Sequence, residues 1–236
     1  MLPLALFKTH FSIGRSILTP KQVFGLAKQR GMEQVVFVED SFYGFRETKA
    51  LSEKEKIKFV FGIRLSVVQD NAEEKDSKLV FFAKNNDGVR SIKDLYTKVH
   101  CSEKNLLIIA DLTKQDLQGV VVAVPFYDSY IFNNLFYFGL SDIQFQGKTN
   151  DLVFLEEDNG HPFDRLISQQ LRRLKAAPLL LSKSIFYENR DDAEALQFYK
   201  AVCNRSQGKS PSFGNPNLNH FCSKEFCWES YLESNA

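Results

Sequence analysis

The chain has 236 residues, of which 44% are hydrophobic and 25% are charged, and its formal net charge is +1. This composition is typical of a folded domain, and a nearly neutral chain lacks the overall basic charge that favours non-specific binding to nucleic acid. The sequence contains no apolar run of 18 residues and no secretory signal, which predicts a cytoplasmic protein without a membrane span.

Short apolar runs alternate with amphipathic segments along the chain. The runs predict buried strands, and apolar residues spaced three and four apart predict helices. Thr19 and Pro20 can open the first helix as a cap and a first-turn proline, and Gly31 can end it. The predicted strands are 4–10, 35–38, 59–68, 79–83, 106–110, 119–125, 152–155 and 178–181. The predicted helices are 19–31, 44–56, 86–99, 127–138, 163–174 and 191–203.

The alternation of strands and helices predicts an α/β fold with a parallel sheet, either open or closed. No internal repeat or linker divides the chain before its last 30 residues. From about residue 207 to Phe221 the sequence becomes rich in Gly, Pro, Asn and Ser. We therefore assign 1–206 to one β/α domain and 207–236 to a C-terminal tail.

Candidate catalytic residues lie where predicted strands end. His10 ends the first strand and Asp40 follows the second, and the carboxyl ends of parallel strands are where active sites form. Two such side chains do not complete a metal site, so a hydrogen-bonded polar pair is the alternative to a metal centre.

Three cysteines and one histidine form a second candidate metal site. His220, Cys222 and Cys227 lie close together in the sequence, and Cys203 could supply a fourth ligand to a structural zinc ion. The alternative is that these are free thiols buried in an aromatic segment.

Several segments resemble, in order and wording, the N-terminal PHP (polymerase and histidinol phosphatase) domain of bacterial or phage DNA polymerase III alpha subunits, the C-family replicative polymerases. The most specific is Leu79–Leu95, LVFFAKNNDGVRSIKDL, which resembles the family segment Leu-Leu-Ala-Lys-Asn-x-x-Gly-Tyr-x-Asn-Leu. Residues 8–18, 31–41, 57–64 and 178–195 resemble other family segments.

The resemblance implies an irregular seven-stranded β/α barrel, a distorted relative of the TIM barrel. In intact members of the family, the C-terminal mouth of this barrel binds divalent metals and hydrolyses phosphoesters, in some polymerases as a proofreading 3′–5′ exonuclease. The tail at 207–236 would then begin the next polymerase region.

The same resemblance implies that most metal-binding positions are changed. His10 and Asp40 are the remnants of the metal site. The substituted positions are Lys8, Ser41, Arg64, Asn159, Ser184 and Phe186. Ammonium and guanidinium groups repel metal ions, so Lys8, Arg64 and Lys183 would take the place of the cations rather than hold them. We expect one or more of these bases to form a salt bridge with Asp40.

This pattern predicts a domain with no catalytic residues and no metal cofactor. Its role would be structural: it would pack against the polymerase thumb, dock a separate proofreading exonuclease, and meet DNA only through the parent DNA-directed DNA polymerase. The first alternative is a residual phosphoesterase or 3′–5′ exonuclease that uses Mg, Mn or Zn with His10, Asp40, Glu39 or His161. The second is a phosphate- or single-stranded-DNA-binding module that uses Lys8, Arg64 and Lys183.

Overall fold

The computed structural model describes residues 3–70, 76–136, 143–145, 147–161, 163–174, 177–204 and 223–234. The chain divides into two compact units. Unit 1 comprises Met1–Phe61, Asp158–Asp164 and Ser182–Ala236, and unit 2 comprises Gly62–Glu157 and Arg165–Leu181. Strands β3 (Lys58–Val68) and β8 (Leu179–Ile185) contribute residues to both units.

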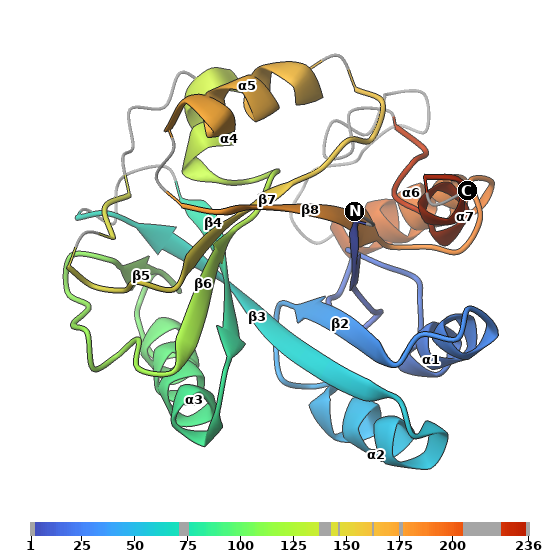
Figure 1. Ribbon diagram of the computed structural model, residues 1–236, viewed down its shortest axis with the longest axis horizontal. Helices are drawn as coiled ribbons and strands as arrows, with labels where there is room; N and C mark the ends of the chain where they lie inside the picture. Colours follow the sequence, from blue (N-terminus) through green and yellow to red (C-terminus); the bar gives the residue numbers. More distant parts are fainter. Residues whose placement is uncertain are drawn as a thin grey trace. The chain divides into compact units, whose positions relative to one another are not determined.

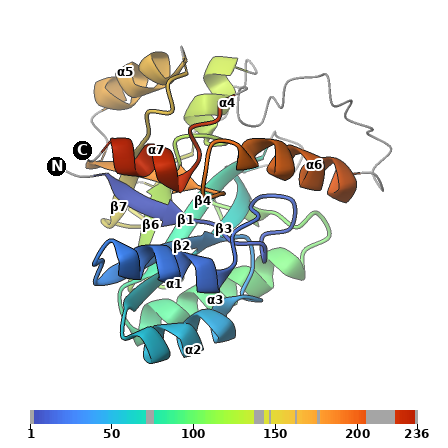
Figure 2. The same ribbon diagram turned by 90° about the vertical axis from the view of Figure 1, so that its right-hand side faces the viewer.

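Unit 1 places helices against two short parallel strands. These elements are β1 (Leu4–Phe7), α1 (Pro20–Gln29), β2 (Gln34–Glu39), α2 (Phe45–Glu55), α6 (Asp192–Asn204) and α7 (Trp228–Glu233). Both views show α1 lying against β2, with α2 beside α1 (Figures 1 and 2).

Unit 2 is built around the strand pairs of β4 and β6. Its elements are β4 (Ser77–Ala83), α3 (Asn86–His100), β5 (Leu107–Ile108), β6 (Val120–Val124), α4 (Tyr130–Phe136), β7 (Leu152–Glu156) and α5 (Asp164–Leu174). Helix α3 packs on β4, β5 and β6. No helix in the described part of the chain is long and apolar enough to span a membrane.

Backbone pairing joins seven strands in a closed ring. Hydrogen-bonded neighbours follow the order β2-β1-β8-β7-β6-β4-β3, a further pairing joins β2 to β3, and β5 adds to β3 outside the ring. This confirms the predicted seven-stranded β/α barrel.

The prediction of a parallel sheet is wrong for one strand. β4 is antiparallel to both of its neighbours, β3 and β6. The pairs β1–β2, β1–β8, β6–β7, β7–β8 and β3–β5 are parallel. A parallel crossover needs a dozen or more residues, usually including a helix, whereas only residues 69–76 connect β3 to β4. The short connection therefore makes these two strands an antiparallel pair.

Helix α1 begins and ends as the sequence predicts. The Thr19 side chain accepts a hydrogen bond from Gln22 N, and the Gln22 side chain accepts one from the Thr19 backbone, which completes a capping box. Gly31 follows the helix with φ +69°, a conformation that favours glycine after a helix end.

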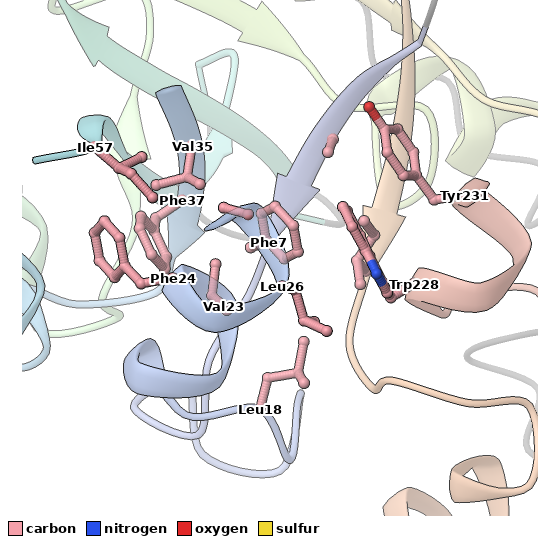
Figure 3. Packing of buried hydrophobic residues seen from close by; sticks show 13 residues of the cluster. Phe7, Leu18, Val23, Phe24, Leu26, Val35, Phe37, Ile57, Trp228 and Tyr231 are labelled. Atoms are coloured by element: carbon pink, nitrogen blue, oxygen red, sulfur yellow. The ribbon is translucent and has the colours of Figure 1, made fainter. Parts of the chain in front are cut away.

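An aromatic core holds unit 1 together. Phe7 on β1 lies between Phe37 of β2, at 6.4 Å between ring centroids, and Trp228 of α7, at 5.7 Å (Figure 3). Tyr231 stacks on Trp228 at 5.0 Å. Burial of large aromatic side chains contributes strongly to stability, so α7 is part of the hydrophobic core rather than a surface addition.

The C-terminal segment also pairs with the backbone beyond β8. Phe186 N donates to Phe226 O at 2.9 Å, and Trp228 N donates to Tyr187 O at 3.1 Å. The sequence assigned this segment to a tail, but between residues 226 and 231 every side chain except that of Glu229 is buried in unit 1. Trp228 packs on β1 and Phe226 stacks on Phe186 beyond β8. Because these partners are far away in the sequence, the local composition of the segment does not reveal its packing.

A single arginine secures α7 to the turn after β8. Arg190 donates two hydrogen bonds to Glu225, at 3.0 and 2.9 Å, and also pairs with Glu229 and Glu233. The hydrogen bond from Arg190 lowers the pKa of Glu225 to about 2, against a usual value of 4.5. Bidentate arginine–carboxylate pairs are among the stronger polar interactions in proteins.

The segment that best resembles the polymerase family has a clear structural role in unit 2. Asn85 caps α3, because its Oδ1 accepts a hydrogen bond from Gly88 N at 2.9 Å. Gly88 lies directly against the backbone carbonyl of Gly119, so a Cβ at position 88 would collide with that carbonyl. The Asn-x-x-Gly spacing thus lets α3 begin close to the start of β6.

We expect Gly88→Ala to lower the free energy of unfolding by about 1–3 kcal/mol, the usual cost of overpacking. Urea denaturation measures this change. Gly25→Ala is the matched control, because Gly25 is exposed within α1 with nothing near its Cβ position. That variant should gain about 0.5–1 kcal/mol of stability. Equal stability of the Gly88→Ala variant and the wild type would refute the close contact.

We expect Arg190→Gln to destabilise the protein at neutral pH and much less in acid. The pKa of Glu225 is depressed in the folded state, so the contribution of the pair is complete above the usual pKa and is lost as the pH falls towards about 2. Urea denaturation of both proteins at neutral and acidic pH measures the difference. Arg90→Gln, which removes an exposed pair with Asp87, should have little effect at either pH. A destabilisation by Arg190→Gln that is independent of pH would contradict this account.

Candidate functional site

The candidate site of unit 1 lies where β1 and β2 end. These strands are parallel neighbours, with Leu6 opposite Val36 and Phe7 opposite Phe37. β2 continues two residues beyond the end of β1. Lys8 and Asp40 each follow directly after their strand, so they lie at the same end of this parallel pair.

Lys8 and Asp40 form an ion pair at 3.1 Å between Nζ and Oδ1. The Lys8 side chain is only 5% exposed, and the Asp40 side chain is 33% exposed. A buried ammonium is costly unless a carboxylate compensates it, so the pair fixes both side chains. The predicted salt bridge to Asp40 is confirmed for Lys8.

A second carboxylate lies beneath this pair. Glu39 Oε1 accepts hydrogen bonds from Thr9 N at 2.9 Å and Thr9 Oγ1 at 2.6 Å, and Oε2 accepts one from Ser12 Oγ at 2.5 Å. Burial raises the pKa of Glu39, while the hydrogen bonds from Ser12 and Thr9 and the charge of Lys8 act in the opposite direction. The carboxylate thereby fixes the loop that follows β1.

His10 does not end β1, which stops at Phe7. Its backbone N donates to Leu18 O at 2.8 Å, its Nδ1 lies 3.3 Å from the same oxygen, and its ring lies 4.3 Å from that of Phe11. The hydrogen bonds of the loop to Glu39 turn the chain before residue 10, which explains the early strand end. The imidazole of His10 therefore has a structural contact within its own loop.

Substituted positions of unit 1 have contacts within the fold. Ser41 Oγ accepts a hydrogen bond from Tyr43 N at 3.4 Å, and Ser184 is half-buried on β8. The Phe186 ring stacks on Phe226 at 5.5 Å, which ties the end of β8 to the C-terminal segment. Asn159 is buried after β7, and its backbone oxygen accepts a hydrogen bond from Ser223 Oγ at 2.9 Å.

Lys183 lies in an open hollow of about 860 Å³ in unit 1. The side chain is buried, and its Nζ donates to Asp158 O at 3.2 Å. His161 and Arg190 also line the hollow, together with the acidic residues Glu225 and Glu233. Sequence reasoning missed the pairing of Arg190 with its glutamates, whose only signal was their spacing of four residues in a segment assigned to the tail.

Arg64 makes its ion pair within unit 2. Its Nη1 lies 3.3 Å from Asp128 Oδ2. Of the three bases that we expected near Asp40, only Lys8 forms an ion pair with it. Lys183 donates to a backbone carbonyl, and Arg64 pairs with a different aspartate.

The described residues do not form a metal centre. Within this part of the chain, no group of three His, Cys, Asp or Glu side chains is placed to hold a metal ion. The carboxylates at this site already have other partners, because Asp40 pairs with Lys8 and Glu39 accepts three hydrogen bonds. These residues therefore do not fit the metal cluster that intact members of the resembled family bind.

The proposed cysteine site can be followed only in part. Cys203 is half-buried on α6, and Cys227 is buried as the N-cap of α7, where its sulfur accepts a hydrogen bond from Ser230 N. Burial raises the pKa of the Cys227 thiol. His220 and Cys222 lie outside the described residues.

Comparison with known protein families finds a match over part of the chain. Residues 7–122, just under half of the chain, match the family model described as PHP domain. No curated protein matches the chain. The solved structures that match include a candidate metal-dependent phosphoesterase from Bifidobacterium adolescentis, with 13% sequence identity and a TM-score of 0.47, over 78% of this chain and 88% of that one.

We expect Lys8→Met to lower the free energy of unfolding by about 2–3 kcal/mol, because it leaves the carboxylates of Asp40 and Glu39 without the buried ammonium. Urea denaturation measures the change, and the double variant Lys8→Met/Asp40→Asn should recover part of it. Lys28→Met removes an exposed pair with Glu55 and should cost about 0–1 kcal/mol. Equal effects of Lys8→Met and Lys28→Met would argue against a special role for the buried pair.

Proposed function

We propose that this chain is a catalytically silent PHP domain of a DNA polymerase III alpha subunit, and that it serves as a structural and docking module. The observation that carries the proposal is the ion pair between Lys8 and Asp40 at the ends of β1 and β2. An ammonium group bonded to a remnant ligand replaces the positive charge of a metal ion, so the carboxylate gains nothing further from binding one.

The hydrogen bonding of Glu39 supports the same conclusion. A metal ligand must present its oxygen lone pairs to the cation, whereas both oxygens of Glu39 accept hydrogen bonds from Thr9 or Ser12. With Phe186 stacked on Phe226, the end of β8 offers an aromatic ring where the family has a histidine. This end of unit 1 is thus specialised for cohesion rather than hydrolysis.

The polymerase context rests on the resemblance of the segments at 8–18, 31–41, 57–64, 79–95 and 178–195 to alpha subunits. In that context polymerisation belongs to the remainder of the alpha subunit, and the PHP domain contacts the thumb and a proofreading exonuclease. The chain would meet DNA through the parent polymerase. Polymerase palm motifs in a reading frame that continues after residue 236 would support this parent, and an unrelated downstream sequence would count against it.

A metal-dependent phosphoesterase or 3′–5′ exonuclease is the second candidate. The match of residues 7–122 to the PHP domain favours it, because intact members of the resembled family hydrolyse phosphoesters. His10 and Asp40 would be its remaining ligands. Breaking the Lys8–Asp40 pair would have to precede metal binding in this case.

The phosphate-binding alternative receives less support from the geometry. Each of its three bases has an internal partner: Lys8 pairs with Asp40, Arg64 pairs with Asp128, and Lys183 donates to the Asp158 carbonyl. These contacts stabilise the fold and compete with a phosphate group for the same donors.

We expect Mn²⁺ or Zn²⁺ to leave the melting temperature of the full chain unchanged, and we expect no hydrolysis of bis(p-nitrophenyl) phosphate or of end-labelled single-stranded DNA. Thermal unfolding and product analysis measure these outcomes. A rise of several degrees, together with metal-dependent hydrolysis that His10→Ala abolishes, would overturn the proposal in favour of the phosphoesterase. His100→Ala, which removes an exposed histidine of α3, is the matched control.

A further inference from the structure

Exposed leucines are concentrated in one stretch of unit 2. Among the described residues, thirteen large hydrophobic side chains are exposed, and five of them fall between residues 165 and 181. They are Leu166, Leu174, Leu179, Leu180 and Leu181, with exposed fractions from 36% to 52%. Single exposed leucines are ordinary, whereas exposed apolar side chains on one face of a single element indicate an interaction surface, and Leu166 and Leu174 both lie on α5.

Figure 1 shows the course of helix α5, whose two faces differ in burial. Ile167 and Leu171 are buried and attach the helix to the unit. Leu166 and Leu174 are exposed, and they lie eight residues apart with Gln170 between them. Residues at i, i+4 and i+8 form a row along a helix, so the exposed leucines share one stripe.

A basic row runs beside this leucine row. Arg165 and Arg173 are exposed on α5 and are also eight residues apart. Neither arginine forms an ion pair with a described residue, whereas Arg172 pairs with Glu156 at 2.9 Å. The one acidic residue of the helix, Asp164, is buried and accepts hydrogen bonds from Asn159 N and His161 N. The outer side of α5 therefore presents positive charge and apolar surface together.

We propose that the α5 face, defined as Arg165, Leu166, Arg173 and Leu174, docks an acidic amphipathic helix of a partner protein. Apolar side chains of such a helix would cover the two leucines, and its carboxylates would pair with the two arginines. This inference rests on the proposed docking function and names the surface and the chemistry of the partner.

The chemistry of the face favours this occupant over others. DNA would pair with the arginines but would gain little from leucines, because stacking on bases requires aromatic or guanidinium planes. A second copy of the chain joined through the same face about a two-fold axis would bring like charges together. An acidic amphipathic helix can cover the leucines with its apolar side chains and pair its carboxylates with the arginines.

The test uses the full chain and a fluorescein-labelled synthetic peptide with leucines at helical spacing and glutamates on the flanks. Fluorescence anisotropy should show saturable binding that weakens as salt is added. The double variant Leu166→Asp/Leu174→Asp and the double variant Arg165→Glu/Arg173→Glu should each reduce the affinity about tenfold or more, or about 1.4 kcal/mol. All four positions are exposed, so the fold should persist, and circular dichroism verifies this.

Phe198→Asp supplies the matched control. Phe198 is 53% exposed on α6 in unit 1, so this substitution removes a comparable apolar surface outside the α5 face. It should leave the affinity unchanged. A peptide in which lysines replace the glutamates should not bind.

Three results would overturn the inference. They are the absence of saturable binding, an equal loss of affinity in the Phe198→Asp variant, and α5-dependent binding of single-stranded DNA or self-association in place of peptide binding. The peptide titration is independent of the metal assays. Metal-dependent hydrolysis with intact peptide binding would refute only the proposal that the domain is catalytically silent. A chain without hydrolytic activity that does not bind the peptide would refute only the proposed role of the α5 face.

Discussion

The ion pair between Lys8 and Asp40 governs the organisation of the candidate site. A lysine with 5% of its side chain exposed must keep a carboxylate beside it, so the ends of β1 and β2 are held at a fixed distance. Glu39 extends this constraint into the following loop through Thr9 and Ser12. Charge compensation inside the protein thus performs the organising task that a bound cation performs in a metal site.

The two units attach segments that are far apart in the sequence through different interactions. In unit 1, aromatic packing of Phe7 with Trp228 and the contacts of Arg190 with three glutamates attach the C-terminal helix. In unit 2, close backbone approach at Gly88 and Gly119 joins α3 to β6. Both are long-range contacts in sequence, so each unit depends on pairs of segments that are far apart along the chain.

Local sequence signals predicted the elements better than their pairing. Thr19 and Gly31 marked the bounds of α1 because capping depends on neighbouring residues. The antiparallel β4 was missed although its signal was present: the connection at 69–76 is too short for a crossover helix. The resemblance led us to expect a base beside Asp40 but left three bases open, of which the structure pairs Lys8. The pairing of Arg64 with Asp128 depends on residues 64 positions apart and left no local trace.

The interrupted course of unit 1 has a consequence for its biosynthesis. Its first strand emerges from the ribosome long before Trp228, which completes the packing around Phe7. Most of unit 2 is synthesised in between and can fold earlier, because domains generally fold as units during synthesis. Until Trp228 and Tyr231 are synthesised, the side of Phe7 that Trp228 covers stays exposed, so chaperone demand should be greatest in that interval.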